Sequence, residues 1–125
     1  MAKIYILFSH TLLQEQKQEL KNNFLCDEII FLPSKLQSLW SNIKEEDDYF
    51  LLFCDFLKEN AQKNDYVLVQ GEWGITYKIV NFCFKEGFIP VYSFSKRAAY
   101  EEVKEGTVIK TSYFKHIKFK KYEIS

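Results

Sequence analysis

Four short apolar runs, separated by longer stretches that read as helices, set the strongest limit on how this chain can fold. The runs are rich in Ile, Val, Leu and aromatic residues, as expected of strands buried on both faces of a sheet. The predicted strands are Lys3–Phe8, Glu28–Leu32, Tyr66–Val69 and Ile89–Phe94. Since parallel strands need a long crossover between them, the alternation predicts an α/β fold with a doubly wound parallel sheet.

The segments between the strands carry apolar residues at helical spacing or signals of a helix end. The predicted helices cover about Leu12–Asn23, a short stretch after Ser34, Tyr49–Gln62 and Ile75–Glu86. Boundary signals accompany them: Thr11 as N-cap of the first helix, the acidic cluster Glu45–Asp48 before the third, and Gly87 closing the fourth.

The last third of the chain alternates differently and predicts two more strands, Thr107–Thr111 and Phe114–Tyr122, antiparallel with a turn between them. His116, Lys118 and Lys120 are expected on one face of the second, and an exposed edge protected by lysines is the favoured interpretation of that face. Pro90 favours an edge strand or a first-residue position. The fold class expected is therefore a Rossmann-like three-layer α/β fold, a mostly parallel sheet with a C-terminal β-hairpin, in one domain spanning residues 1–125.

Composition narrows the class of protein. The chain of 125 residues is 47% hydrophobic and 18% aromatic, which requires a packed core. Its net charge is zero, which argues against a protein that coats long nucleic acid. Residues 1–64 carry seven basic and ten acidic side chains and residues 65–125 carry ten and seven, so an anion site is expected in the second half.

Cysteine spacing and the N-terminus suggest a cytoplasmic protein. Cys26, Cys54 and Cys83 are widely spaced among apolar residues, which favours buried reduced thiols over a zinc site or disulfides. The apolar run before Ser9 is too short for a signal sequence or a membrane span. We expect no metal, no cofactor and no membrane partner.

Three polar segments follow predicted strands: Ser9–Thr11, Gln70–Thr76 and Ser93–Arg97. In an open parallel sheet the ligand crevice lies outside the carboxyl ends of the strands. We therefore expect these segments to converge on one site.

The segment Gln70–Thr76 joins a strand to a helix and contains two glycines. Gly71 and Gly74 would let a ligand approach the backbone, and the helix N-terminus would suit a phosphate. Trp73 could stack on a base, with a hydrogen bond from Gln70 or Thr76. Glu72 disfavours an anion there and could instead face solvent or orient Lys96 or Arg97. A plain turn with a packing Trp is the competing interpretation.

Three other side chains could take part in chemistry. His10 follows the first strand directly and could act as a general acid or base. Lys96 and Arg97 could stabilise charge on a phosphodiester. The alternatives are a hydrogen-bonded loop histidine and solvated loop charges. Neither a Ser/His/Asp triad nor a metal–carboxylate cluster can be assembled from the sequence.

Five motifs, in this order, resemble a small family of type III CRISPR accessory proteins: Phe8–His10, Leu36–Ile43, Val69–Tyr77, Ser95–Arg97 and Phe114–Phe119. The resemblance implies a lone Rossmann-like domain related to the CRISPR-associated Rossmann-fold sensors, forming a homodimer that binds cyclic oligoadenylate. It implies a ring nuclease that degrades cyclic tetra-adenylate and so switches off the antiviral response. The chain is too short to carry an effector nuclease as well.

Within that resemblance the expected mechanism is metal-independent, because the ribose 2′-hydroxyl beside each phosphodiester is the nucleophile. His10 would assist proton transfer, and Lys96 or Arg97 would stabilise the transition state. The residues expected to bind the ligand are Ser9, Thr11, Gln70, Gly71, Glu72, Trp73, Gly74, Thr76 and Ser95. The alternatives left open are a non-catalytic sponge or sensor module for the cyclic nucleotide, and an unrelated nucleotide-binding or protein-interaction domain.

Overall fold

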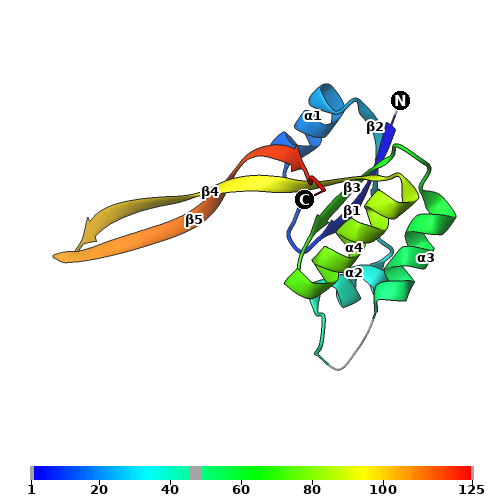
Figure 1. The fold of residues 1–125 in the computed structure, drawn as a ribbon. Helices are drawn as coiled ribbons and strands as arrows, with labels where there is room; N and C mark the ends of the chain where they lie inside the picture. Colours follow the sequence, from blue (N-terminus) through cyan, green and yellow to red (C-terminus); the bar gives the residue numbers. More distant parts are fainter. Residues whose placement is uncertain (1, 46–48, 125) are drawn as a thin grey trace.

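A five-stranded sheet forms the centre of the molecule in a computed structural model that describes residues 2–45 and 49–124 (Figure 1). The strand order is β2-β1-β3-β4-β5; the first four strands pair in parallel and β5 is antiparallel to β4. The strands are β1 (Ala2–Phe8), β2 (Cys26–Phe31), β3 (Tyr66–Gln70), β4 (Ile89–Lys104) and β5 (Thr107–Lys121). The helices are α1 (Gln14–Asn23), α2 (Ser34–Ser41), α3 (Phe50–Asn60) and α4 (Trp73–Glu86). The predicted α/β class, with a mostly parallel sheet and a C-terminal hairpin, is confirmed.

Helices cover both faces of the sheet because successive strand residues point to opposite sides. Tyr5 and Leu7 of β1 belong to a buried cluster that includes residues of α2, α3 and α4. Ile4 and Ile6 belong to a second cluster, to which α1 contributes Leu20. The prediction that β1 is buried on both faces is therefore confirmed, and the sheet lies between two packed cores.

Helix ends differ from the predictions at α1 and α4. The predicted cap at Thr11 is wrong: α1 begins at Gln14, and Gln16 Oε1 accepts the Leu13 N–H at 2.8 Å. Helix α4 begins at Trp73, two residues earlier than predicted, whereas Gly87 ends it in a left-handed conformation (φ 83°) as expected. Of the acidic cluster expected before α3, residues 46–48 lie outside the described part of the chain.

The C-terminal hairpin is much longer than predicted. The two predicted strands, Thr107–Thr111 and Phe114–Tyr122, form one strand that ends at Lys121. The turn lies at residues 105–106, where Glu105 and Gly106 both have positive φ. Such a two-residue turn suits a twisted hairpin. The edge or first-residue expectation for Pro90 is wrong, because Pro90 is the second residue of β4 and lies opposite Val67 of β3, with β5 on the other side of β4.

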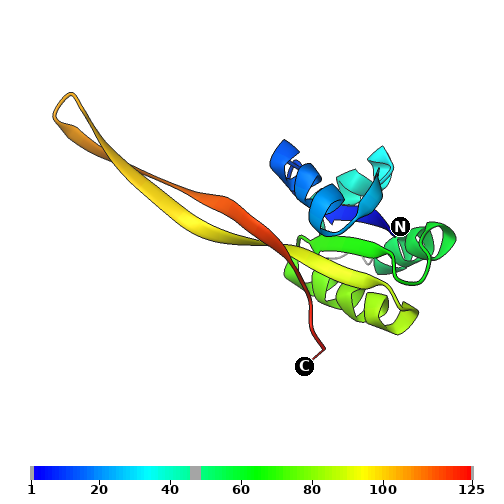
Figure 2. The same ribbon diagram turned by 90° about the horizontal axis from the view of Figure 1, so that it is seen from above.

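Beyond Val91 the strand β4 has only β5 as a partner, so the hairpin leaves the body of the protein. We call its outer part, residues 96–115, the arm. Figures 1 and 2 show the arm as a twisted two-stranded ribbon projecting from the sheet. A two-stranded ribbon has no core of its own, so its apolar side chains stay exposed in a single copy. Val103 and Phe114 are 72% and 76% exposed.

A bulge at the root of the arm changes which side chains face the body. Phe94 lies opposite Lys118 and Ser95 opposite His116, so Ile117 is an extra residue in β5. His116 therefore shares a face with Phe119, at 4.6 Å between ring centroids, while Lys120 lies over the Phe94 ring. The expected basic face of His116, Lys118 and Lys120 is wrong, since one extra residue reverses the alternation.

The three cysteines are free and buried, as predicted. Burial raises the pKa of Cys26 to about 11 and that of Cys83 to about 12. Within the described residues, no helix is both long and apolar enough to cross a membrane.

Candidate functional site

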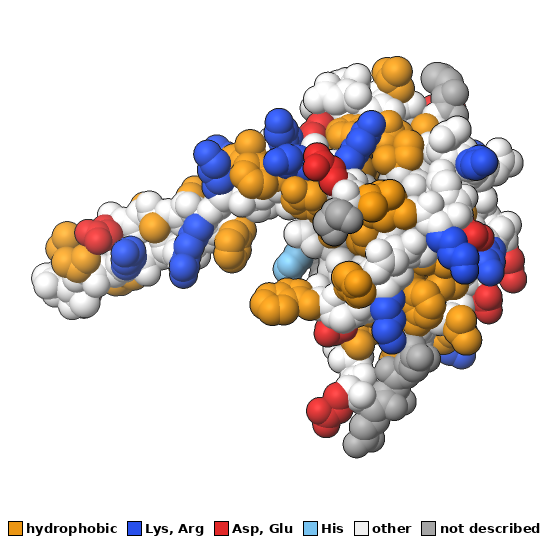
Figure 3. Space-filling model, in the orientation of Figure 1, with side chains coloured by type: hydrophobic (Ala, Val, Ile, Leu, Met, Phe, Trp, Pro, Cys, Tyr) orange, Lys and Arg blue, Asp and Glu red, His pale blue; other side chains and the backbone are white. Residues whose placement is uncertain are grey.

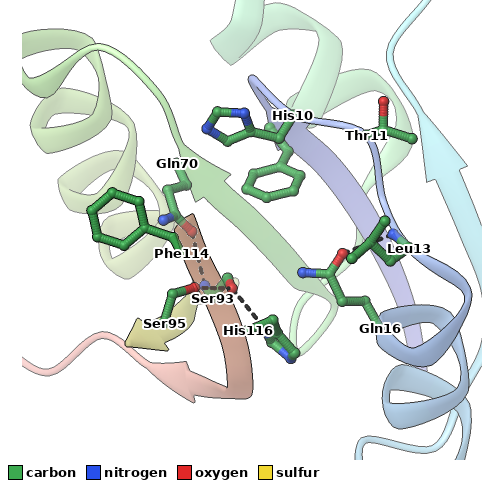
Figure 4. A pocket seen from close by; sticks show the side chains of 10 residues that line it. His10, Thr11, Leu13, Gln16, Gln70, Ser93, Ser95, Phe114 and His116 are labelled. Atoms are coloured by element: carbon green, nitrogen blue, oxygen red, sulfur yellow. Dashed lines mark hydrogen bonds between the residues drawn. The ribbon is translucent and has the colours of Figure 1, made fainter. Parts of the chain in front are cut away.

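A pocket of about 580 Å³ opens at the carboxyl ends of β1 and β3, where the arm leaves the body; we call it the root pocket. Side chains from α1, from the turn before it and from the strands β1, β3, β4 and β5 converge on it (Figure 4). Its lining consists of Phe8, His10, Thr11, Leu13, Gln16, Gln70, Ser93, Ser95, Phe114 and His116. Polar and aromatic side chains thus share one open cavity at the edge where α/β sheets bind ligands.

Gln70, the last residue of β3, holds the strand ends together. Its backbone carbonyl accepts the Ser9 N–H at 3.2 Å and the Trp40 indole N–H at 3.3 Å. Its side-chain Oε1 accepts the Ser93 N–H at 2.8 Å, as drawn in Figure 4. The three polar segments expected to converge do so through this residue, although Ser93–Arg97 is part of β4 and not a loop.

A hydrogen-bonded network of three side chains reaches the root pocket through Ser93 and His116, which line it. The hydroxyl of Ser93 lies 2.5 Å from His116 Nδ1, and His116 Nε2 lies 2.7 Å from Glu19 Oε1. Glu19 belongs to α1, and its other oxygen accepts the Phe119 N–H at 2.7 Å. The His116 and Glu19 side chains are only 6% and 13% exposed. This hydroxyl–imidazole–carboxylate chain ties β5 to α1 and ends at the cavity.

His10 lies elsewhere on the lining, in the turn after β1, where its exposed ring contacts Phe8 edge-on at 5.5 Å between centroids (Figure 4). The chain contains two histidines, and both line the root pocket although they are far apart in sequence. Two imidazoles at one cavity can supply a proton acceptor and a proton donor to the same reaction.

The turn between β3 and α4 does not present free N–H groups to a phosphate. The Glu72 carboxylate accepts the N–H groups of Ile75 at 2.9 Å and Gly74 at 3.0 Å, and these bonds hold the pKa of Glu72 below its usual range. The Gly71 N–H is bonded to Thr76 Oγ1 at 3.1 Å. The phosphate cradle predicted at Gly71–Gly74 is therefore disfavoured, because a carboxylate occupies the place that the anion would take.

Lys96 and Arg97 lie on opposite faces of the arm. Arg97 is opposite Phe114, which lines the root pocket, whereas Lys96 is opposite Lys115 on the other face of the ribbon. Figure 3 shows basic side chains along the arm and a histidine in the angle between arm and body. Arg97 is thus the nearer of the two predicted cations to the root pocket.

Of the predicted site residues, His10, Thr11, Gln70 and Ser95 line the root pocket. Ser9 lies beside it, with its hydroxyl 3.5 Å from the Gln70 carbonyl. The lining does not include Gly71, Glu72, Trp73, Gly74, Thr76, Lys96 or Arg97. Trp73 is 91% exposed on the first turn of α4.

Gln16 and Glu19 were not among the candidates named from the sequence. Ser93 was named only as the start of the third polar segment, and His116 only as part of a basic strand face. For His116 a signal existed, since it is the second of two histidines in the chain. Glu19 gave none, because it lies in a helix rich in Gln and Lys. Among residues 2–45 and 49–124, no group of three His, Cys, Asp or Glu side chains could hold a metal ion.

A family model described as the uncharacterized protein MJ1673 family matches residues 2–120. The chain is also 44% identical over 126 residues to the uncharacterized protein MJ1673 of Methanocaldococcus jannaschii, with 98% of each chain covered. No solved structure matches the chain.

Proposed function

The chain belongs to the MJ1673 family, and we propose that it is a ring nuclease that binds cyclic oligoadenylate and cleaves it without a metal ion. Cyclic tetra-adenylate is the proposed substrate, and its loss would switch off type III CRISPR signalling. The observation that carries the proposal is that both histidines of the chain line one pocket, of mixed polar and aromatic lining, at the carboxyl ends of the strands.

The proposed reaction needs little from the protein beyond alignment, proton transfer and positive charge. The ribose 2′-oxygen attacks the adjacent phosphorus in line, the P–O5′ bond breaks, and a linear product with a 2′,3′-cyclic phosphate results. One group must take the 2′-hydroxyl proton, and another must give a proton to the leaving 5′-oxygen. Well-placed acids and bases contribute about 10²–10⁴-fold to such steps.

The residues divide these tasks according to their positions. His10 transfers a proton at the mouth of the root pocket, and Arg97, on the pocket face of the arm, stabilises charge on the phosphate. Thr11, Gln70 and Ser95 bind the ligand from the lining. Trp73 is proposed to stack on an adenine outside the pocket, together with Tyr77 one turn further along α4; both rings are exposed.

The proposed active form is a cytoplasmic homodimer of Rossmann-like three-layer domains. Helices packed on both faces of a sheet with the order β2-β1-β3-β4 support the layered description. The exposed apolar side chains of the arm support the homodimer, since a second copy would bury them: Tyr100, Val103, Val108, Ile109, Tyr113 and Phe114. A symmetric pair also matches the repeated units of a cyclic ligand.

The test is a product assay with cyclic tri-, tetra- and hexa-adenylate in EDTA. We expect linear products with 2′,3′-cyclic phosphate ends over many turnovers, with cyclic tetra-adenylate cleaved fastest. A ring that is bound but stays intact would instead identify a sponge or sensor module. Failure to bind any ring, together with a monomeric state, would indicate an unrelated nucleotide-binding or protein-interaction domain.

The placement of the two cations gives a second, internal test. Arg97→Ala should lower the cleavage rate more than the affinity, since its charge acts on the transition state. Lys96→Ala should have the smaller effect, because Lys96 lies on the opposite face of the ribbon. Lys110→Ala, a charge removed further out along the arm, serves as the control. Equal losses of rate and affinity in Arg97→Ala would mean that Arg97 only holds the ligand.

A further inference from the structure

We infer that Ser93, His116 and Glu19 form a proton relay that accepts the 2′-hydroxyl proton, with His10 supplying the proton to the 5′-oxygen. This inference rests on the proposed function and assigns to the root pocket a general base that the sequence analysis did not identify. It makes Ser93 the group that touches the substrate. His116 and Glu19 are positioning residues that act through it.

The hydrogen bonds fix the direction of the relay. An ionised carboxylate can only accept, so Glu19 Oε1 at 2.7 Å requires the proton of His116 to be on Nε2. In the neutral imidazole Nδ1 then carries a lone pair, and the Ser93 hydroxyl at 2.5 Å donates to it. The Ser93 oxygen is left with lone pairs that can accept from another hydroxyl. The hydroxyl of Ser95 is such a neighbour at 3.1 Å, and a ribose 2′-hydroxyl in the pocket can take its place.

The burial of these three side chains indicates a role beyond attaching β5 to α1. Ser93 is 5% exposed, and the His116 and Glu19 side chains are nearly as well shielded, which strengthens hydrogen bonds and holds their geometry. The bond from Phe119 N–H to Glu19 Oε2 would suffice to fasten β5, and it fixes the carboxylate. Attachment of β5 to α1 does not explain why the hydrogen bonds continue from Glu19 through the His116 imidazole to the Ser93 hydroxyl, which lines the root pocket.

The step balances with the groups present. The 2′-hydroxyl proton moves to Ser93 Oγ while Ser93 gives its own proton to His116 Nδ1, and the imidazolium formed is stabilised by Glu19. The 2′-oxygen forms its bond to phosphorus, and the P–O5′ bond breaks. The 5′-oxygen takes a proton from protonated His10. Exchange with water then returns both histidines to their starting states.

The closing experiment compares two substrates in single-turnover reactions at saturating enzyme. One is cyclic tetra-adenylate, and the other carries sulfur in place of each bridging 5′-oxygen. A thiolate leaves without being protonated, so the second substrate needs a base but no acid. The variants are His10→Ala, Ser93→Ala and Glu19→Gln, with Ser112→Ala on the exposed arm as the control.

We expect His10→Ala to be slow on the oxygen substrate and close to wild type on the sulfur substrate. Ser93→Ala and Glu19→Gln should be slowed on both, by about 10²–10⁴-fold. Glu19→Gln keeps the size of the side chain, and its amide can still accept the Phe119 N–H. Its NH₂ group donates to His116 Nε2, which moves the imidazole proton to Nδ1 and blocks the relay.

Long-range ¹H–¹⁵N spectra of the histidines add a readout that needs no substrate. We expect the Nε2–H tautomer of His116 in wild type and the Nδ1–H tautomer in Glu19→Gln. If the wild-type protein cleaves the ring and Ser93→Ala or Glu19→Gln cleaves it at the wild-type rate, the relay is overturned but the proposed function is not. Rescue of either variant by the sulfur substrate would also overturn the relay. Wild-type protein that leaves the ring intact would overturn the proposed function, and the relay with it.

Discussion

Replacing Gly71 by Ala tests how tightly the turn after β3 is held against the core. A methyl group built at this position would lie 2.7 Å from Trp40 Nε1 and 2.9 Å from both Ser9 Oγ and Trp40 Cε2. Trp40 cannot move away easily, because it is 1% exposed and packs edge-on against Phe53 at 5.1 Å between centroids. The turn must shift instead, and with it the Gln70 carbonyl that Trp40 and Ser9 share.

The magnitude follows from the cost of overpacking. Forcing an extra methyl group into a packed site costs about 1–3 kcal/mol, and we expect Gly71→Ala to lower the free energy of unfolding by this amount. Gly74→Ala is the matched control. The three atoms nearest to its methyl group would all belong to the Glu72 carboxylate, at 3.3 Å or more, and Ala favours a helix over Gly by up to about 1 kcal/mol. Gly74→Ala should therefore be neutral or slightly stabilising.

Urea unfolding of both variants, followed by tryptophan fluorescence, measures these differences. The thermal midpoint of Gly71→Ala should fall by roughly 3–5 °C for each kcal/mol lost. Because Gln70 also holds Ser93, the same variant should weaken any activity of the root pocket. A Gly71→Ala protein as stable as wild type, or less affected than Gly74→Ala, would refute the reasoning that Trp40 is fixed.

Three further predictions concern the tyrosine beyond β5, the cap of α4 and the arm. The Tyr122 hydroxyl donates a hydrogen bond to the Val69 carbonyl at 2.6 Å, and burial raises the pKa of Tyr122 to about 12. The contribution of Tyr122 to stability is therefore complete below about pH 10 and is lost as the pH rises to about 12. Tyr122→Phe should lower the free energy of unfolding by about 1 kcal/mol at pH 8 and flatten its alkaline decline, as measured by urea unfolding between pH 8 and 12. The pKa of Glu72 is lowered in the folded protein, so its helix cap stabilises the protein fully above the usual carboxyl pKa. This stabilisation is lost as the pH falls through the lowered pKa. Glu72→Gln should therefore lower the thermal midpoint at pH 7 but not at pH 2. Val103 and Val108 face each other across the arm at 72% and 60% exposure, and changing both to Lys should convert the proposed dimer to monomer in sedimentation velocity without lowering the thermal midpoint of the body.

The strands and helices of the body could be predicted because local patterns decide them. The apolar runs of β1 and β3 are buried on both faces, and Gly87 ends α4 for reasons that act within a few residues. The convergence of the polar segments after the strands also followed from sheet topology alone, and Gln70 makes the contacts that join them.

The errors occur where a tertiary contact or one inserted residue overrides the local pattern. Glu72 was recognised as unfavourable for an anion, but its alternative role as a cap depends on α4 starting at Trp73. The turn at Glu105–Gly106 lies inside a run of polar and charged residues that gives little indication of a long hairpin. Glu19 contributes to the site from α1 across nearly the whole length of the sequence, and no spacing rule could reveal that contact.

The bulge at Ile117 explains both why the site was missed and how it is built. In a regular ladder Ile117 would lie opposite Ser95 and face the root pocket, while the His116 ring would point to the other side of the ribbon. The extra residue reverses this order, so an imidazole is buried against Glu19 and an isoleucine is left 45% exposed. Hydrophobic burial alone would favour the opposite arrangement. The hydrogen bonds of His116 to Ser93 and Glu19 offset that preference, and the local distortion is of the kind that sheets use to aim a side chain at a functional site.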